Sequence, residues 1–312
     1  MTEPLRPLSV GELLDRTFSL YRQNFKLLVG VAILGPAALL CFQMTLALVG
    51  FGGRNGAGVL RNPGSVSLTL GLGLFFYLIG HAVSVAATTR AVAAVYLGKS
   101  ITVAEALASV KGRVLRVIKV MLAAILLAGL VAMALIGAGG AIFAAALSTG
   151  QSSGGRAGAV FGGVVGAAVL VASIVAAIAF ALRYALSVQA CIVEDLGVKA
   201  SLERSKALTK GGRRRIMTVL FVCSTVMYVV ALLFAGLGML VPGHANLLAH
   251  QIVQNIFGLF AGALGAPLIT AALSLVYYDE RVRKEAFDLQ LLMDSLEEPP
   301  RAKAPEASPT LG

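Results

Sequence analysis

The chain has 312 residues, of which 58% are hydrophobic and only 13% are charged, and its formal net charge is +11. Soluble domains have roughly 45–50% apolar and about 25% charged residues, so the composition excludes an ordinary soluble protein. The positive charge is confined to particular loops, which argues against a nucleic-acid partner. An all-α integral membrane protein with six spans of about 20 residues each is therefore predicted.

Residues 9 to 25 are predicted to form an amphipathic helix that lies flat in the membrane interface. Ser9 and Glu12 have the spacing of a capping box, in which each side chain bonds to the backbone N–H of the other residue. The first two spans follow, at 27 to 51 and 67 to 97. Pro36 lacks an N–H, so we expect a kink there, with the freed carbonyl satisfied by a neighbouring helix.

A polar stripe marks the second span, because His81, Ser84 and Thr88 stand at i, i+3 and i+7 on one helix face. Ionisable groups inside a membrane are costly to bury and are therefore candidate functional residues. Two interpretations stay open, a hydrogen-bonded structural histidine and a proton relay. The other histidines, His244 and His250, have no acidic or thiol neighbours at ligand spacing, so neither a metal site, a cofactor nor a catalytic motif is predicted.

The same order of elements then recurs. Thr102 and Glu105 repeat the capping-box spacing, and an amphipathic helix is expected to run on from them through Lys119 into the third span. The third and fourth spans are predicted at 120 to 147 and 159 to 193, joined by a short Ser/Gly turn.

The third amphipathic segment, 194 to 215, is the clearest of the three. One helical stripe contains Val198, Ser201, Leu202, Ser205, Leu208 and Thr209. The opposite face contains Lys199, Glu203, Lys206 and Lys210. Gly211 and Gly212 are predicted to end this helix before the fifth span begins.

The fifth and sixth spans are predicted at 216 to 241 and 251 to 278, the latter with a second proline kink at Pro267. Apolar residues from Val282 to Leu296 follow a seven-residue pattern, which makes this C-terminal helix a candidate contact for a protein partner or a second copy of the chain. Residues 299 to 312 are rich in Pro and Ala and are predicted to be a disordered tail.

Superimposing Ser9, Thr102 and Gly197 gives steps of 93 and 95 residues. We interpret the chain as a single membrane domain, 1 to 298, built from three units, each an amphipathic interfacial helix plus a helical hairpin. The units are 9 to 97, 102 to 193 and 197 to 290. Because every unit has the same direction, we expect the hairpins to be related by rotation about the membrane normal; the alternative is charged helices between spans without a true repeat.

The distribution of Lys and Arg predicts the orientation. The N-terminus, the two long interfacial loops and the C-terminus hold 4, 6, 8 and 5 of these residues, and the three outer turns hold 2, 1 and 0. Positive charge accumulates on the cytoplasmic side, so both termini are predicted to be cytoplasmic.

The densest basic cluster is Lys210, Arg213, Arg214 and Arg215. Two interpretations remain open: a site for anionic lipid headgroups, since arginine binds phosphate with two parallel hydrogen bonds, and a simple topology signal.

Four segments of the chain also carry a family resemblance: LSVGELLDRTFSLYRQNF at 8 to 25, ITVAEAL at 101 to 107, SLERSKALTKGGRRR at 201 to 215 and YYDERVRKEAFDLQLL at 277 to 292. With these the chain resembles the glycerophosphoryl diester phosphodiesterase membrane domain family, a group of bacterial six-span proteins. The resemblance implies a multi-pass protein of the bacterial cytoplasmic (inner) membrane. The catalytic half of the fused members has no counterpart here, so it implies no enzymatic activity.

We therefore interpret the protein as a non-enzymatic inner-membrane protein that acts through contacts with anionic lipids or with a protein partner. The alternative is a small transporter or channel, for which only His81, Ser84, Thr88 and Gln43 could line a polar path. An enzyme of lipid metabolism comes third.

Overall fold

The computed structural model describes residues 7–51, 63–240 and 247–285, and the regular secondary structure in this part of the chain is entirely helical. Most of the predicted outer turns at 52 to 66 and 242 to 250, and the C-terminal pattern beyond residue 285, lie outside the described residues. The elements are α1 (Val10–Gln23), α2 (Phe25–Ala32), α3 (Leu34–Phe51), α4 (Pro63–Tyr96), α5 (Val103–Ala108), α6 (Val114–Ala181), the short 3₁₀-helix η1 (Leu182–Tyr184), α7 (Ser187–Val193), α8 (Val198–Thr209), α9 (Arg213–Met239) and α10 (Leu247–Glu285).

Six helical segments are long and apolar enough to cross a membrane, as predicted, and this makes the chain a multi-pass membrane protein. They are Phe25–Leu46, Ser67–Tyr96, Val114–Thr149, Val160–Val193, Arg213–Met239 and Ala249–Glu285.

The three predicted interfacial helices α1, α5 and α8 begin where the sequence places them, with Ser9, Thr102 and Gly197 as their N-caps. Both capping boxes are confirmed: the hydroxyls of Ser9 and Thr102 accept from the backbone N–H three residues on, and the glutamates there bond back. The hydrogen bonds with Thr102 lower the pKa of Glu105, so this box is intact at neutral pH and weakens only as the pH falls through that lowered value.

The polar members of the α8 stripe are buried and hydrogen-bonded. Ser205 Oγ donates to the carbonyl of Arg183 at 2.8 Å and accepts the N–H of Leu186 at 3.1 Å. Both partners lie in the irregular turn between α6 and α7, where backbone groups lack helical partners. The stripe therefore docks α8 against that turn, and its serines supply hydrogen bonds that an aliphatic residue would not.

A break separates each of the helices α1, α5 and α8 from the span that follows it. The expected end of the third interfacial helix is confirmed: α8 stops at Thr209, and Gly211 has φ of +86°. The expected continuous helix from Thr102 into the third span is wrong. Instead α5 ends at Ala108 and the chain turns before Val114, because Gly112 adopts φ of +79°, a left-handed conformation that glycine takes without strain.

The kink expected near Pro36 is present as the break between α2 and α3. Pro36 has no N–H for the carbonyl of Ala32, four residues earlier, and the hydroxyl of Ser84 on α4 donates to that carbonyl at 2.8 Å instead. Near the second proline, Pro267, the hydroxyl of Tyr21 on α1 donates to the carbonyl of Leu264 at 2.8 Å. Both prolines thus lie near a hydroxyl from another helix, although α10 runs through Pro267 as a single helix without a break.

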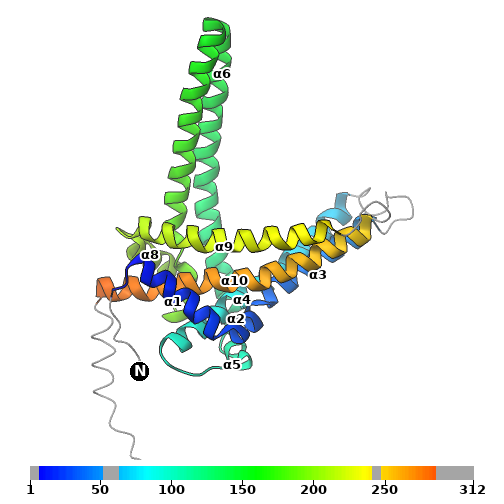
Figure 1. Ribbon diagram of the computed structural model, residues 1–312, viewed down its shortest axis with the longest axis vertical. Helices are drawn as coiled ribbons and strands as arrows, with labels where there is room; N and C mark the ends of the chain where they lie inside the picture. The colour runs from blue at the N-terminus through cyan, green and yellow to red at the C-terminus, as the bar shows by residue number, and fades with distance from the viewer. Residues whose placement is uncertain (1–6, 52–62, 241–246, 286–312) are drawn as a thin grey trace, which may run out of the picture.

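The spans form two groups of unequal burial. Helices α3, α4, α9 and α10 run side by side, and α10 contacts the other three. In the apolar 18-residue stretch that marks α10 as a span, 61% is buried inside the protein. The corresponding stretches in the two legs of α6 are 6% and 11% buried. Figure 1 shows α6 rising across this four-helix group rather than alongside it. The predicted rotation of three hairpins about one axis is not shown by this arrangement.

Helix α6 is itself a hairpin of two long legs that turn at Gly155, where φ is +57° (Figure 1). A Cβ added to Gly139 would stand 2.5 Å from the hydroxyl of Ser173, and one added to Gly166 would stand 2.8 Å from the backbone of Phe143. These glycines let the legs approach closely. The outer surfaces of both legs carry exposed Leu, Ile, Val, Met and Phe side chains, a surface suited to the apolar interior of a membrane.

At the opposite end from this hairpin turn, α1, α5, α7 and α8 pack around the ends of the spans. We call these four helices, with the span ends that they contact, the basal layer. It holds much of the protein's core, including the fully buried Leu13, Leu28, Ala106, Ile192 and Leu208. Most of the protein's charged side chains lie here as well, and they form the candidate site.

Candidate functional site

Two buried carboxylates follow the apolar part of α10. Asp279 and Glu280 are 1% and 2% exposed. Arg215, in the first turn of α9, forms ion pairs with both, and its Nη2 lies 2.6 Å from Glu280. One turn further along α10, Arg283 pairs with Asp279 at 3.0 Å and Lys284 with Glu280 at 3.3 Å. Each buried acid therefore has two basic partners, which offsets the cost of removing it from water.

The same cluster holds the start of the described chain. The backbone N–H of Leu8 donates to Asp279 at 2.7 Å, and its carbonyl accepts from Arg215 at 3.3 Å and from Arg283. The residue that precedes the capping box of α1 is thereby fixed to the end of α10, across 271 positions of sequence.

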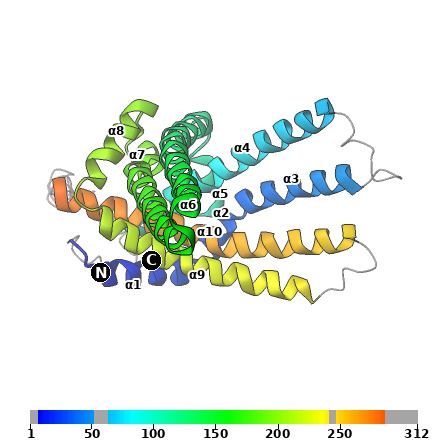
Figure 2. The same ribbon diagram turned by 90° about the horizontal axis from the view of Figure 1, so that it is seen from above.

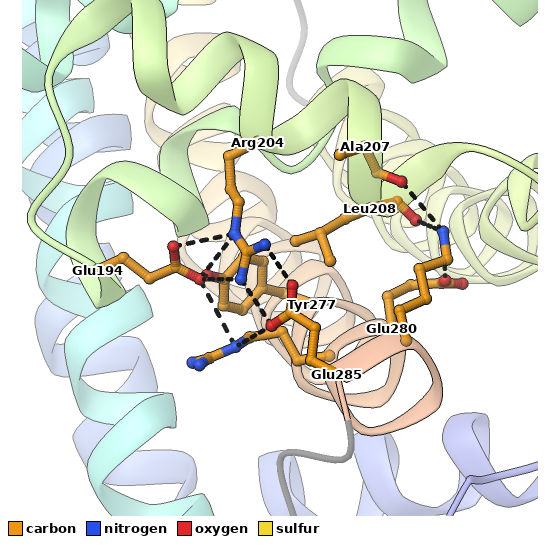
Figure 3. Close-up of polar contacts among 9 residues, drawn as sticks. Glu194, Arg204, Ala207, Leu208, Tyr277, Glu280 and Glu285 are labelled. Carbon is orange, nitrogen blue, oxygen red and sulfur yellow. Dashed lines mark hydrogen bonds and ion pairs between the residues drawn. The ribbon is translucent and has the colours of Figure 1, made fainter. Parts of the chain in front are cut away.

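A second cluster connects α7, α8 and α10. Figure 3 shows the guanidinium of Arg204 between the carboxylates of Glu194 and Glu285, which it approaches at 2.8 Å and 2.7 Å. Tyr277 donates its hydroxyl to Glu194, and Arg281 pairs with both acids. Hydrogen bonding to Glu285 raises the pKa of Arg204 above its ordinary value, so this arginine stays charged throughout.

Lys284 adds a contact at the C-terminal end of α8. Its ammonium donates to the carbonyls of Leu208 and Ala207 (Figure 3) and to that of Lys210 at 2.7 Å. These carbonyls lack helical N–H partners, and a cation is favourable at the negative end of a helix.

A third cluster lies at the base of the α6 hairpin. Asp195, in the loop between α7 and α8, forms an ion pair with Arg113 at 3.1 Å and accepts a hydrogen bond from Arg116 at 2.6 Å. Its φ of +55° is unusual for a residue other than glycine, although aspartate tolerates it better than most. The turn thereby points a carboxylate at the start of the third span.

The structure separates the four residues predicted as a headgroup site. Arg215 is engaged with Asp279 and Glu280, and its side chain is only 17% exposed. Lys210 and Arg214 are exposed, and Arg213 is half-buried with no hydrogen-bond partner for its Nε atom. Three of the four basic groups thus remain available at the junction between α8 and α9.

The predicted polar stripe packs against α2 and α3. Ser84 is buried and bonds to Ala32, as described above, and a Cβ on Gly35 would lie 3.4 Å from His81 Nδ1. Thr88 is buried with no hydrogen-bond partner for its hydroxyl in the described structure. Helix packing thus accounts for Ser84, and the stripe does not converge on a single polar partner.

No group of three or more metal-binding side chains occurs among residues 7–51, 63–240 and 247–285. The acids Asp279 and Glu280 were missed by sequence reasoning, although a signal exists: an Asp-Glu pair directly after an apolar span, with Arg283 and Lys284 four residues further on. Searches of protein-family models, of curated proteins and of solved structures found no match to this chain.

Proposed function

We propose that this multi-pass membrane protein belongs to the bacterial inner membrane and acts without catalysis, by holding anionic lipid headgroups against its basal layer. The observation that carries the proposal is the contrast between adjacent arginines. Arg215 forms ion pairs with Asp279 and Glu280. The side chains of Lys210, Arg213 and Arg214 form no ion pair with any described residue.

The position of these three cations suits lipid phosphate. They lie between α8 and the first turn of a span, α9. With α8 in the membrane interface, as proposed, this junction would lie at the depth of the lipid headgroups. Each Lys or Arg near an anionic leaflet contributes about 1 kcal/mol, and a guanidinium additionally binds phosphate with two parallel hydrogen bonds.

The test compares three forms of the whole protein in nanodiscs that contain phosphatidylglycerol. Replacing Lys210, Arg213 and Arg214 by Gln should reduce the number of anionic lipids retained in native mass spectrometry, and Arg213→Lys with Arg214→Lys should lose part of the binding. Arg215 stays unchanged in all forms because it supports the fold. If the Gln form inserts normally and keeps the same lipids, the cluster is a topology signal and the proposal fails.

The proposed orientation places the basal layer and both termini in the cytoplasm, in agreement with the asymmetry of Lys and Arg. After removal of Cys41, Cys191 and Cys223, single cysteines at positions 55, 152 and 245 should react with an impermeant reagent from outside. A cysteine in place of Lys206 should stay protected, and labelling of this position from outside would reverse the orientation.

The proposed threefold unit requires the α6 hairpin to lie parallel to the other spans in a flat bilayer. Both of its legs meet the basal layer through non-α turns, at 109–113 and 182–186, which gives the hairpin a place to pivot. Spin labels at Leu130 and Tyr228, both exposed, should therefore move closer together when the protein passes from detergent into nanodiscs. An unchanged distance would contradict the parallel arrangement.

Two further proposals concern partners and kinship. The seven-residue pattern from Val282 to Leu296, most of it outside the described residues, supports a contact with a protein partner or a second copy of this chain. The short segments at 8 to 25 and 201 to 215 support kinship with the glycerophosphoryl diester phosphodiesterase membrane domain family, in its membrane part alone.

A further inference from the structure

The breaks that follow α1, α5 and α8 occupy the same place in each predicted unit. The first lies at Asn24, the second at 109–113 and the third at 210–212. Each break faces the basal end of the second span of its own unit. These ends are Val95 to Ile101 for the first unit, the α7–α8 loop for the second and the end of α10 for the third.

In two of the three units the chain supplies a carboxylate at this place. Arg113 and Arg116, beside the second break, pair with Asp195. Arg215, beside the third break, pairs with Asp279 and Glu280. At the second junction, and for Arg215 at the third, positive charge is thus paired with an acid of the chain, whereas the side chains of Lys210, Arg213 and Arg214 stay unpaired among the described residues, as noted above.

The first unit differs. Its break shares an open groove of about 740 Å³ with the end of α4, lined by Arg22, Gln23, Asn24, Phe25, Lys26, Leu27, Val95, Gly98, Lys99, Ser100 and Ile101. Among the described residues that line the groove there is no Asp or Glu, and three are cations. Arg22, Lys26 and Lys99 are exposed, and their side chains form no ion pair with any residue in the described part of the chain.

The first and second units differ in the residue that has a positive φ after the second span. After the second span of the second unit, the residue with positive φ is Asp195, at +55°. After the second span of the first unit it is Gly98, at +75°, which has no side chain, and Lys99 follows it. The first unit therefore has a glycine where the second unit has an aspartate, and a lysine follows this glycine.

We propose that a phosphate group from outside the chain binds in this groove and takes the place of the missing carboxylate. Three cations around one cavity repel each other unless an anion lies among them. Asn24 is at once the C-cap of α1 and the N-cap of α2, so the two helix ends offset each other there and the positive potential of the groove comes from the three side chains.

The groove lining also indicates which phosphates fit. Phe25, Leu27, Val95 and Ile101 bring apolar surface next to the cations, and Phe25 is 41% exposed. A ligand with a phosphate and an adjoining apolar part, such as an anionic phospholipid, matches both features, and free phosphate shares the charge alone. The lipid source rests on the membrane placement proposed above, but the groove is separate from Lys210, Arg213 and Arg214.

The test introduces a carboxylate into the groove by mutation. Gly98→Asp places a carboxylate where the second unit has one, and Gly98→Asn is the matched neutral control, because both side chains tolerate positive φ better than most. Whole protein in phosphatidylglycerol nanodiscs is examined for bound lipid by native mass spectrometry. Inorganic phosphate is titrated by calorimetry into the same proteins in phosphatidylcholine nanodiscs.

We expect Gly98→Asp to weaken binding at least tenfold and Gly98→Asn to stay within about threefold of the wild type. Loss of bound phosphatidylglycerol identifies a lipid headgroup, and loss of phosphate binding identifies a free phosphate. If both Gly98 variants fail to fold, Lys26→Gln with Lys99→Gln should produce the same loss. Equal binding of lipid and of phosphate by wild type and variants would overturn the proposal. The Gln form at Lys210, Arg213 and Arg214, measured in parallel, reports separately on the third junction.

Discussion

The guanidinium of Arg215, in the first turn of α9, lies 2.6 Å from a carboxylate oxygen of Glu280 near the end of α10. Glu280 is 2% exposed, so the charge on this acid depends on partners within the protein. Breaking a buried ion pair from one side is costly because the other charge stays buried without compensation. This pair therefore serves the fold first, in contrast to the exposed Arg214 beside it.

We predict that Arg215→Gln destabilises the protein by about 3 kcal/mol, the typical cost of removing one partner of a buried pair. Thermal unfolding in detergent should show a clear drop in Tm. Arg214→Gln is the matched control, one residue away and exposed, and should leave Tm unchanged. Adding Glu280→Gln to Arg215→Gln should recover part of the loss, because it removes a buried charge that would keep only Lys284 as a basic partner; a further drop would contradict this account.

A second prediction concerns Ser84 and Pro36. Ser84→Ala leaves the carbonyl of Ala32 without its hydroxyl donor and should cost about 1–3 kcal/mol. Pro36→Ala gives α3 a backbone N–H in reach of the same carbonyl. In that background Ser84→Ala should cost less, and a double-mutant cycle on unfolding in SDS measures the coupling. Additive effects would show that Ser84 contributes through packing alone.

A third prediction uses the missing cap of α8. Gly197 is its N-cap, with no side-chain hydrogen bond and no atom within 4 Å of an added Cβ. Gly197→Ser with Ala200→Glu introduces the capping box that α1 and α5 already have. We expect a gain of about 0.5 kcal/mol and a small rise in Tm. The reverse changes, Ser9→Ala and Thr102→Ala, should each lower Tm, and a fall in Tm on adding the box would refute the capping argument.

The fourth prediction concerns how closely the legs of α6 pack. Gly139→Val would push a side chain into Ser173, and overpacking of this kind costs about 1–3 kcal/mol. Gly140→Val, its neighbour, meets nothing within 4 Å of the new Cβ and is the control. Limited proteolysis in detergent should cut the hairpin faster in the first variant than in the second. Equal rates would mean that the legs do not depend on this contact.

Local features of this fold could be predicted because they depend on a few neighbouring residues. The capping boxes at Ser9 and Thr102 follow from a three-residue spacing, and the break near Pro36 follows from the missing N–H. The buried stripe of α8 follows from helical periodicity. The six spans needed only length and composition.

Features that depend on which way a side chain points around its helix could not be predicted in this way. Successive residues on a helix point about 100° apart, so Arg213, Arg214 and Arg215 look alike in sequence and face different surroundings. The partners of Arg215 lie on another helix, far along the chain. The legs of α6 are apolar all round, and a helix without a polar face gives no indication of which side packs against the protein.

The hydrogen bond between Leu8 and Asp279 also constrains the order in which the molecule is completed during translation. Leu8 leaves the ribosome 271 positions ahead of its partner Asp279, which follows five spans and most of the sixth. Until then the buried face of α1, including Leu13 and Leu20, has no α10 to pack against. Synthesis of the last span is therefore the step that completes the basal layer, and a chain halted before Asp279 leaves α1 with its contacts to α2 and α9 but without those to the end of α10.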